Sequence, residues 1–315
     1  MRRFRNRRRR ALAILLVPAA ALTIGTTTST AAEQRQAAID PAKSSIRFGD
    51  RVTLRGQFPG APGAAVTIQY KAASSRSFRQ VARTRTNENS RWTARVKPRG
   101  TGMWRARLTS APRAPQAGDD PLETQASVDP ETGERRVAVR SVTRVQATGH
   151  AVVGQSVRVK GHVAPGGKRK VTVEIGRKRV STHTNGRGRF DVRVKAGSTG
   201  SYKVRARAKG NRKAAASSDG AGKVTVYRHA QASWYGPGLY GNRTACGQTL
   251  SPSTLGVAHK SMPCGTKLTL RHGNNTVRVK VIDRGPYVGN REFDLTEATR
   301  NKLGFGSTGT ILTSK

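Results

Sequence analysis

The sequence predicts an all-β protein, with two β-sandwich repeats followed by a separate C-terminal domain. Three observations lead to this prediction. Apolar residues alternate with Arg, Lys, Thr or Gln in many short segments, which is the period-two pattern of half-buried strands. One block of this pattern occurs twice. The last third of the chain has a different composition and contains both cysteines.

The first 32 residues have the organisation of an export signal. Arginines precede an apolar run of 15 residues, Ala11 to Gly25, which is interrupted by Pro18. A membrane span needs about 20 residues, so this shorter run predicts a secretory signal that is cleaved after small residues near Ala31. An uncleaved membrane anchor and a basic nucleic-acid-binding arm are the alternatives. The signal implies a secreted or cell-wall-associated protein with no stable membrane span after its removal.

The repeat is visible by direct comparison of two regions. Residues 48–58 match residues 153–163 without a gap, and residues 92–97 match residues 190–195. Turn residues such as Gly and Pro separate the alternating segments, and several short strands at this spacing are typical of a β-sandwich. The two units resemble the immunoglobulin-like modules of bacterial surface proteins.

The predicted domain organisation follows from these patterns. The first repeat is expected at 37–110 and the second at 137–228, with a Pro-, Gly- and acid-rich linker at 111–136. The C-terminal domain is expected at 230–315. Neither repeat contains a nucleophile, an acid pair or a ligand cluster, so both are interpreted as spacers and wall-binding modules.

The charge of the chain is strongly positive, with 59 Lys and Arg residues against 17 Asp and Glu residues and a formal net charge of +42. Inside a cell this charge would suggest nucleic acid as the partner. The export segment and the low aromatic content, 5%, argue against a specific nucleic-acid partner. Anionic cell-wall polymers, bound through the basic repeats, are the expected partners.

The two cysteines, Cys246 and Cys264, are 18 positions apart. An even number of cysteines in an exported protein predicts one disulfide. A zinc site would need four Cys or His ligands at short spacing, and the histidines are too scattered for this. No metal site and no cofactor are predicted.

The C-terminal domain contains a series of short motifs in a fixed order. They are Ser233-Trp234-Tyr235-Gly236, Thr244-Ala245, Ala258-His259, Pro263 with Gly265-Thr266, Asp283-Arg284-Gly285-Pro286, and Asp294-Leu295. Together they resemble the RlpA-type double-psi β-barrel domain of septal lytic transglycosylases, which is related to the first domain of expansins. The resemblance covers about a quarter of the chain and implies a six-stranded barrel with a glycan-binding groove.

Asp283 is the candidate catalytic residue. Val277, Val279 and Val281 alternate with basic residues and predict a strand that ends at this aspartate. The resemblance implies a role for the carboxyl group in catalysis or substrate contact. The alternative is an aspartate that forms a turn by accepting hydrogen bonds from its own backbone.

Asp294 has two interpretations. Its spacing to Glu297 is that of a capping box before a helix, which the sequence favours. The resemblance to expansins implies instead a residue of the polysaccharide groove. In neither case are Asp283 and Asp294 expected to be an acid–base pair.

The chain departs from the RlpA pattern at Gln248, where the enzymes of the family have a glutamate. A glutamine cannot exchange a proton, although it can donate a hydrogen bond to glycan. Glycoside hydrolysis normally needs two carboxyl groups. Lytic transglycosylation can use one, because the attacking group is the 6-hydroxyl of the sugar itself.

Four other residues are candidates for substrate binding. His259 matches a groove position of the family, although a single histidine is more often structural. Trp234 and Tyr235 are candidates for stacking on sugar rings, and by alternation one of them is expected to face the groove. Arg284 follows the catalytic candidate directly.

The sequence therefore predicts a secreted protein that acts on peptidoglycan glycan strands. The favoured activity is lytic transglycosylation, which leaves 1,6-anhydro ends. The alternative is an expansin-like module that binds wall polysaccharide without cleaving it.

Overall fold

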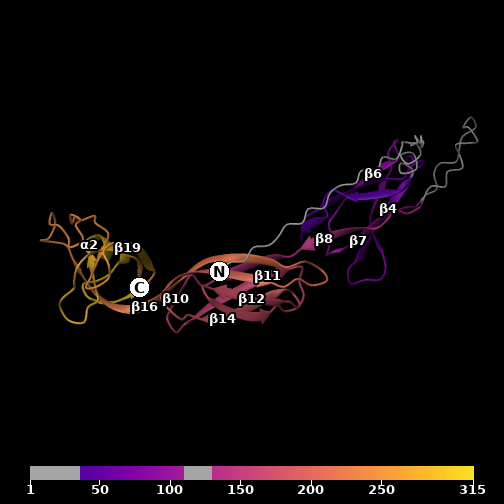
Figure 1. The fold of residues 1–315 in the computed structure, drawn as a ribbon. Helices are drawn as coiled ribbons and strands as arrows, with labels where there is room; N and C mark the ends of the chain where they lie inside the picture. Colours follow the sequence, from indigo (N-terminus) through magenta and orange to yellow (C-terminus); the bar gives the residue numbers. More distant parts are fainter. Residues whose placement is uncertain (1–35, 110–129) are drawn as a thin grey trace, which may run out of the picture.

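The computed structural model describes residues 36–109 and 130–315. The expected export segment, 1–32, and most of the expected linker lie outside these ranges. Within them the chain forms three units in a row, and these follow one another in sequence order (Figure 1). In the described ranges, no helix is long and apolar enough to cross a membrane.

The first unit packs two β-sheets against each other. The smaller sheet has the order β1 (Ala38–Pro41), β3 (Val52–Gln57), β6 (Arg91–Val96). The larger sheet has the order β2 (Ser45–Arg47), β8 (Arg135–Arg140), β7 (Gly102–Leu108), β4 (Ala65–Ala72), β5 (Arg79–Arg85). In β6, Trp92, Ala94 and Val96 are buried while their neighbours are exposed, as the alternation predicts.

The structure differs from the expected start of the second repeat at residue 137. Strand β8 belongs to the first unit, where it pairs in parallel with β2 and antiparallel with β7. Val137 and Val139 are fully buried in the first core. The reason is that β2 needs a partner to join the larger sheet, and the chain supplies one only after the 110–129 segment.

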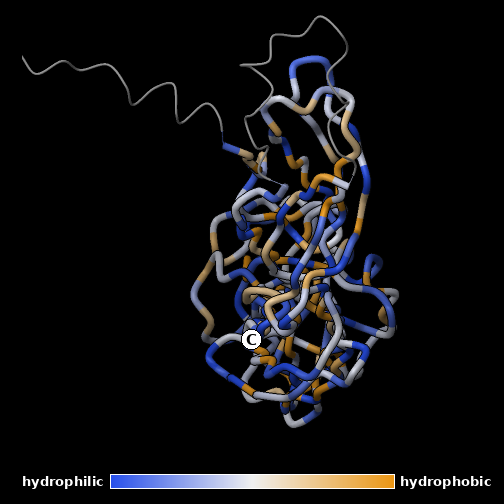
Figure 2. Tube along the Cα trace, turned by 90° about the vertical axis from the view of Figure 1, so that its right-hand side faces the viewer, coloured by the Kyte–Doolittle hydropathy of each residue, from blue (hydrophilic) through white to orange (hydrophobic). Residues whose placement is uncertain are grey.

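The second unit repeats the two-sheet arrangement. One sheet has the order β14 (Arg189–Lys195), β11 (Ser156–Ala164), β9 (Val142–Ala147). The other has the order β13 (Lys178–His183), β12 (Lys170–Ile175), β15 (Gly200–Ala208), β16 (Ser217–Tyr235), and β10 (His150–Val152) pairs with β16 in parallel. Hydrophobic and hydrophilic residues alternate along much of the trace (Figure 2).

A glycine at the equivalent position of each repeat makes room for the packing of its core. A Cβ on Gly56 would lie 2.5 Å from the Trp92 ring, and a Cβ on Gly161 would lie 2.3 Å from the Phe190 ring. Both glycines therefore leave the space into which an aromatic side chain packs. This equivalence supports the repeat that the sequence comparison identified.

A loop of the second unit is inserted into the first. Ala214 is fully buried and forms part of the first hydrophobic core. Beside it, the Thr101 backbone N–H donates to the carbonyl of Lys213 (2.7 Å), and the Ala215 N–H donates to the carbonyl of Val139 (2.8 Å). These contacts fix the two repeats against each other.

The third unit is a closed barrel. Its strands follow the order β16, β20 (Phe293–Thr296), β17 (Val257–His259), β19 (Asn275–Asp283), β18 (Lys267–His272), β21 (Gly309–Thr313), and β21 pairs back onto β16. The expected six-stranded barrel is thus present, and the all-β prediction is confirmed. Helix α2 (Glu297–Leu303) follows β20 and buries Leu303 in the barrel core.

Strand β16 joins the second repeat to the barrel without a break. It is 19 residues long, pairs with β15 through residues 217–226, and pairs with β20 and β21 through residues 228–235. A continuous strand is a stiffer connection than a Gly- or Ser-rich linker. The orientation of the barrel on the second repeat is therefore fixed by one strand (Figure 1).

Candidate active site

Asp283 is the last residue of β19 and is half-buried. Its Oδ1 accepts two backbone hydrogen bonds, from the N–H groups of Ala245 and Arg284, both at 2.8 Å. A register shift in the β17–β19 pairing places Ala258, at the centre of β17, opposite this aspartate. The hydrogen bond from the Arg284 N–H is the one expected of a turn-forming aspartate. The hydrogen bond from Ala245 in addition holds a loop that is distant in sequence.

Asp294 lies in β20 between Phe293 and Leu295, both of which are fully buried in the barrel core. It therefore points away from the core, where the Ser233 hydroxyl donates to its Oδ1 at 2.8 Å. Burial raises the pKa of Asp294, and the negative charge of Asp283 raises it further, against the opposing effects of Ser233 and Arg291.

The two aspartates flank one residue. Ala258 pairs with Asp283 on one side and with Asp294 on the other. Since neighbouring strands are about 4.8 Å apart, the two aspartates belong to backbones about 10 Å apart. A small side chain lies between them. The sequence did not predict that the two form an acid–base pair, but the structure brings them to either side of Ala258.

The expected capping role of Asp294 is wrong. The N-cap of α2 is Thr296, whose Oγ1 accepts a hydrogen bond from the Thr299 backbone N–H at 3.4 Å. Pairing with β16 keeps the chain extended up to Thr296, which is opposite Tyr235. Asp294 is therefore part of the strand, two residues before the cap.

Tyr235 lies at the end of β16, beside both aspartates. Its hydroxyl is enclosed and forms no hydrogen bond of normal geometry with the described residues. Burial, together with the negative charges of Asp283 and Asp294, raises the pKa of Tyr235 well above its ordinary value. Tyr235 thus keeps its proton.

Trp234 does not join this group. It packs against the barrel core, and the guanidinium carbon of Arg300 lies 4.4 Å from the centre of its ring. One face of the indole is therefore covered by a cation. Of the two adjacent aromatic residues, Tyr235 is the one at the aspartates.

Gln248 is exposed and belongs to the loop that also carries Ala245. Its backbone closes the loop, because its carbonyl accepts from the Thr244 N–H (2.7 Å) and its N–H donates to the Thr244 hydroxyl (3.2 Å). The loop holds Asp283 through Ala245. The amide side chain of Gln248 is thus carried by the loop that contacts the aspartate.

The predicted disulfide is confirmed. Cys246 and Cys264 are bonded, with their Cα atoms 5.7 Å apart. The Cys246 N–H donates to the carbonyl of Ile282, and the Gly265 N–H donates to that of Val281. The disulfide therefore joins the two loops that enclose the end of β19, next to Asp283.

His259 lies on the core side of β17. It pairs with Phe293, and the two ring centres are 5.1 Å apart. Its Nδ1 accepts from the backbone N–H groups of Ser261 and Met262, and its Nε2 is 3.7 Å from Oε1 of Glu292. Burial lowers the pKa of His259, although Glu292 opposes the shift. This histidine, the last residue of β17, therefore holds the turn that follows the strand, and by alternation it points to the opposite face from Ala258, which lies between the two aspartates.

Arg284 is turned away from the carboxylate of Asp283. Its Nη1 donates to the carbonyls of Met262 (2.9 Å) and His259 (3.4 Å). Its side chain therefore supports the turn after β17, and only its backbone N–H contacts Asp283.

The other carboxylates of the barrel have partners of their own. Glu292 forms an ion pair with Arg228, whose Nη1 donates to Oε2 at 2.7 Å. Glu297 accepts from the Tyr240 hydroxyl, and this hydrogen bond is the main cause that raises the pKa of Tyr240 to about 12. Asp283 and Asp294 are thus the acidic pair that remains for chemistry in residues 230–315.

One residue beside the site was not predicted. Tyr287 is 76% exposed and follows the corner formed by Gly285 and Pro286. Its ring is therefore open to solvent directly after the motif that contains Asp283. The sequence contained one sign of this residue, because Tyr287 is an aromatic residue that lies outside any alternating segment and directly follows the motif that contains Asp283.

The C-terminal part of the chain is similar in sequence to a known protein family. Residues 227–313 match the family described as Lytic transglycolase. The C-terminal domain is an RlpA-like double-psi β-barrel. A protein named probable endolytic peptidoglycan transglycosylase RlpA, from Synechocystis sp., is 38% identical over 94 residues, which are 29% of this chain and 29% of that protein.

Two further RlpA proteins show the same extent of similarity. The one from Campylobacter jejuni is 42% identical over 25% of this chain and 30% of its own length. The protein from Aquifex aeolicus, named probable endolytic peptidoglycan transglycosylase RlpA, is 40% identical over 30% of this chain and 42% of its own length. The chain spans less than half the length of these relatives, and the similarity is confined to the RlpA-like barrel.

Proposed function

We propose that the RlpA-like barrel acts on the glycan strands of peptidoglycan as a lytic transglycosylase. The observation that carries this proposal is the pairing of Asp283 and Asp294 across Ala258 in a domain that matches the lytic transglycolase family. The names of the RlpA relatives support the same substrate and reaction.

In the proposed reaction, a proton passes from the aspartate pair to the glycosidic oxygen. The bond between that oxygen and the anomeric carbon breaks. The 6-hydroxyl oxygen of the same sugar forms a bond to the anomeric carbon and returns its proton to the pair. Water is not consumed, and the product carries a 1,6-anhydro ring. Because the nucleophile is tethered beside the carbon, the barrel needs to supply only positioning and proton transfer.

We assign the proton transfer to Asp283. Its carboxylate is fixed by the N–H groups of Ala245 and Arg284 at the open end of a strand. Asp294 is held by Ser233, and burial together with the charge of Asp283 raises its pKa, so that the charged form of Asp294 is disfavoured beside Asp283. The hydroxyl of Tyr235 is enclosed near the pair and stays protonated. Gln248 is assigned to substrate binding.

An expansin-like binding module is the second candidate. Gln248 favours it, because a glutamine stands where the resemblance implies a second carboxyl group. In that case the aspartates would hydrogen-bond glycan without transferring a proton.

The location proposed for the protein is the cell envelope, outside the membrane. The apolar run after the N-terminal arginines supports export, and the net charge of +42 supports attraction to anionic wall polymers. Peptidoglycan glycan strands and these polymers are the proposed partners.

The decisive experiment uses the mature full chain and purified peptidoglycan. We expect soluble fragments with 1,6-anhydro ends, detected by mass spectrometry. Gln248→Glu restores the carboxyl group of the family and is expected to increase their release. A chain that binds peptidoglycan but releases no anhydro sugar, both as wild type and as Gln248→Glu, would establish the binding module instead.

A further inference from the structure

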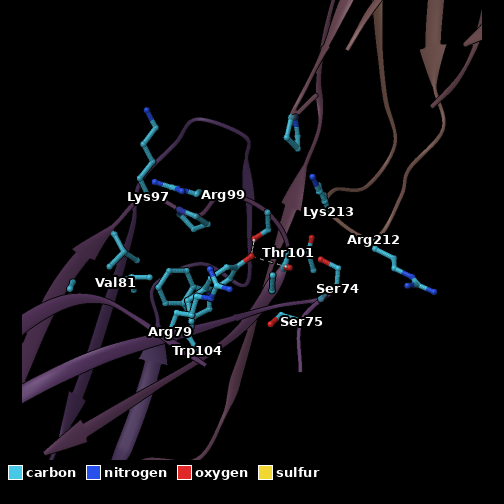
Figure 3. A pocket seen from close by; sticks show the side chains of 18 of the residues that line it. Ser74, Ser75, Arg79, Val81, Lys97, Arg99, Thr101, Trp104, Arg212 and Lys213 are labelled. Atoms are coloured by element: carbon cyan, nitrogen blue, oxygen red, sulfur yellow. Dashed lines mark hydrogen bonds between the residues drawn. The ribbon is translucent and has the colours of Figure 1, made fainter. Parts of the chain in front are cut away.

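A basic cleft lies between the two repeats. All the residues that line it precede the barrel in sequence. The volume of the cleft is about 1060 Å³, and residues of both repeats line it. Five arginines contribute to the lining, namely Arg51, Arg79, Arg95, Arg99 and Arg212. Lys97 and Lys213 are the other two cations. Figure 3 shows Lys97 and Arg99 on one side of the space and Arg212 and Lys213 on the other.

The charge of this cleft has no carboxylate to balance it among the described residues. Its lining includes neither Asp nor Glu, and none of its seven cations forms an ion pair within the described ranges. Some cations elsewhere on the repeats do have a carboxylate partner, for example Lys71 with Glu134 and Arg158 with Asp191. In the cleft, seven cations without such a partner line one concave space. Its positive charge is available to a ligand.

The walls of the cleft are held in place before any ligand arrives. The loop that carries Arg212 and Lys213 is anchored by the burial of Ala214 in the first core. The Thr101 N–H also donates to the carbonyl of Lys213 at 2.7 Å. A site that is already formed loses less conformational entropy on binding than a flexible one.

A further cation lies behind one wall. The Arg169 side chain is 4% exposed, and its Nη2 donates to the carbonyl of Pro165, which lines the cleft. Its Nε has no hydrogen-bond partner among the described residues. Arg169 has no carboxylate partner in the same ranges, so its charge adds to the positive field at the cleft.

The floor of the cleft offers no aromatic platform. Trp104 is 1% exposed and packs on Tyr70, with the ring centres 4.8 Å apart. The Tyr70 hydroxyl donates a hydrogen bond to the carbonyl of Gly100 at 2.9 Å. The nearby Phe78 ring is contacted by Lys71 and Arg105 at 4.5 and 4.1 Å. Nucleic-acid bases and sugar rings bind to exposed aromatic faces, which this cleft lacks.

We infer that the cleft binds a strand of a polyol-phosphate polymer of the cell wall. Arginine side chains bind phosphate oxygens through two parallel N–H groups, and arginines are the majority of the cations here. A polyol phosphate carries regularly spaced negative charges and needs no stacking surface. The hydroxyl group of Ser74, which also lines the cleft, is present for the polyol. The two repeats thus tether the barrel to the wall through one defined site.

The test measures binding of the mature full chain to a short poly(glycerol phosphate). The cleft variant combines Arg99→Glu and Arg212→Glu. The control combines Arg144→Glu and Arg177→Glu, two exposed arginines on the second repeat that do not line the cleft. Both variants lower the net charge by the same amount. Isothermal titration at physiological salt gives the affinity and the stoichiometry.

We expect saturable binding at one site per chain. The cleft variant should lose at least tenfold in affinity and the control less than threefold. The salt dependence of the remaining binding should also be weaker in the cleft variant, because fewer phosphates are neutralised. Equal losses in the two variants would overturn the proposal, because binding would then follow net charge alone.

Two competing polymers test the occupant. A polyuronate of equal charge and a single-stranded oligonucleotide are measured with the same proteins. Tighter binding of either one than of the polyol phosphate would overturn the assignment. The outcome is separable from that of the barrel proposal, because the cleft variant should still release anhydro sugars from peptidoglycan stripped of phosphate polymers.

Discussion

The repeats and the barrel are built from the same kind of alternating strand, yet they distribute polar chemistry differently. In the repeats, the connections are mostly short turns, and the strands present cations along their exposed faces. In the barrel, longer connections converge on the ends of β16, β17, β19 and β20, where Asp283, Asp294 and Tyr235 meet. Strand alternation alone therefore produces a charged surface, whereas convergent loops produce a site.

The fixed loops of the barrel sharpen this contrast. Ala245 holds Asp283, and the Cys246–Cys264 disulfide holds the loop that contains Ala245. In the repeats, a loop is anchored in a comparable way where Ala214 inserts into the first core. That insertion forms the basic cleft. In both regions, a ligand site arises where a loop is held against another element.

The largest expected effect is a loss of activity on substitution of Asp283, which substitution of another acid of the barrel should not cause. Asp283→Asn keeps the size of the side chain but removes the exchangeable proton, so release of anhydro sugars should fall at least about a hundredfold. Glu292→Gln is the matched control, because Glu292 is paired with Arg228 and is not part of the site. Its activity should stay within a few fold of wild type. Folded Asp283→Asn protein with wild-type turnover would remove Asp283 from the mechanism.

The second prediction concerns the disulfide. Replacing both Cys246 and Cys264 by serine removes a cross-link over 18 residues, which by loop entropy stabilises the barrel by about 3 kcal/mol. We expect the barrel to unfold at lower denaturant concentration while the repeats are unaffected. Hydrogen exchange, read separately for each unit, measures this. A loss of protection shared equally by repeats and barrel would mean that the three units unfold together.

The third prediction tests the glycine shared by the repeats. In Gly161→Ala, the new Cβ would lie 2.3 Å from Phe190 and 2.6 Å from the carbonyl of Arg144, so the second repeat should lose about 1–3 kcal/mol. Gly149→Ala is the control in the same unit, because nothing lies within 4 Å of its Cβ. It should change stability by no more than about 1 kcal/mol, in the stabilising direction if at all. Similar losses in the two variants would argue against the packing explanation.

The smallest effect concerns Asp294 and pH. Its pKa is raised in the folded barrel, so the folded state binds the proton more tightly than the unfolded state. Its contribution to stability is therefore present at low pH and is lost as the pH rises from the ordinary aspartate range through the raised pKa. Asp294→Asn, which is neutral at every pH, should make the barrel more stable than wild type at pH 7. It should bring no gain at pH 3.

Thermal unfolding followed at both pH values checks this sign. Ser233→Ala is the companion variant, because it removes the hydrogen bond to Asp294 without removing the carboxyl group. It should lower stability. A gain for Asp294→Asn at pH 3 that disappears at pH 7 would contradict the direction of the pKa shift.

Most of the architecture could be predicted from local patterns. Alternation gives the strands, and the matching blocks around Gly56 and Gly161 give the repeat, because both depend on neighbours within a few residues or on an internal copy. The cysteine pair gives the disulfide. The ordered motifs of the last third give the RlpA-like barrel and single out Asp283.

Other features depend on contacts between distant segments, and only the tertiary structure decides them. Strand β8 joins the first core because β2 lacks a partner there, although its sequence follows the linker. Asp294 is a strand residue, because pairing with β16 extends the chain as far as Thr296. A register shift at Ala258 sets Asp283 opposite this residue, and Asp294 pairs with it from the other side.

The sequence by itself determined an all-β chain with two repeats, one disulfide, a large positive charge and a catalytic candidate. The tertiary structure decided which two acids flank Ala258, which aromatic residue lies near them, and where basic residues line a cleft. The physical reason is the range of the interactions. Alternation and turn preference act between residues that are near in sequence. Strand register, loop insertion and the close approach of like-charged side chains arise only when distant segments pack together.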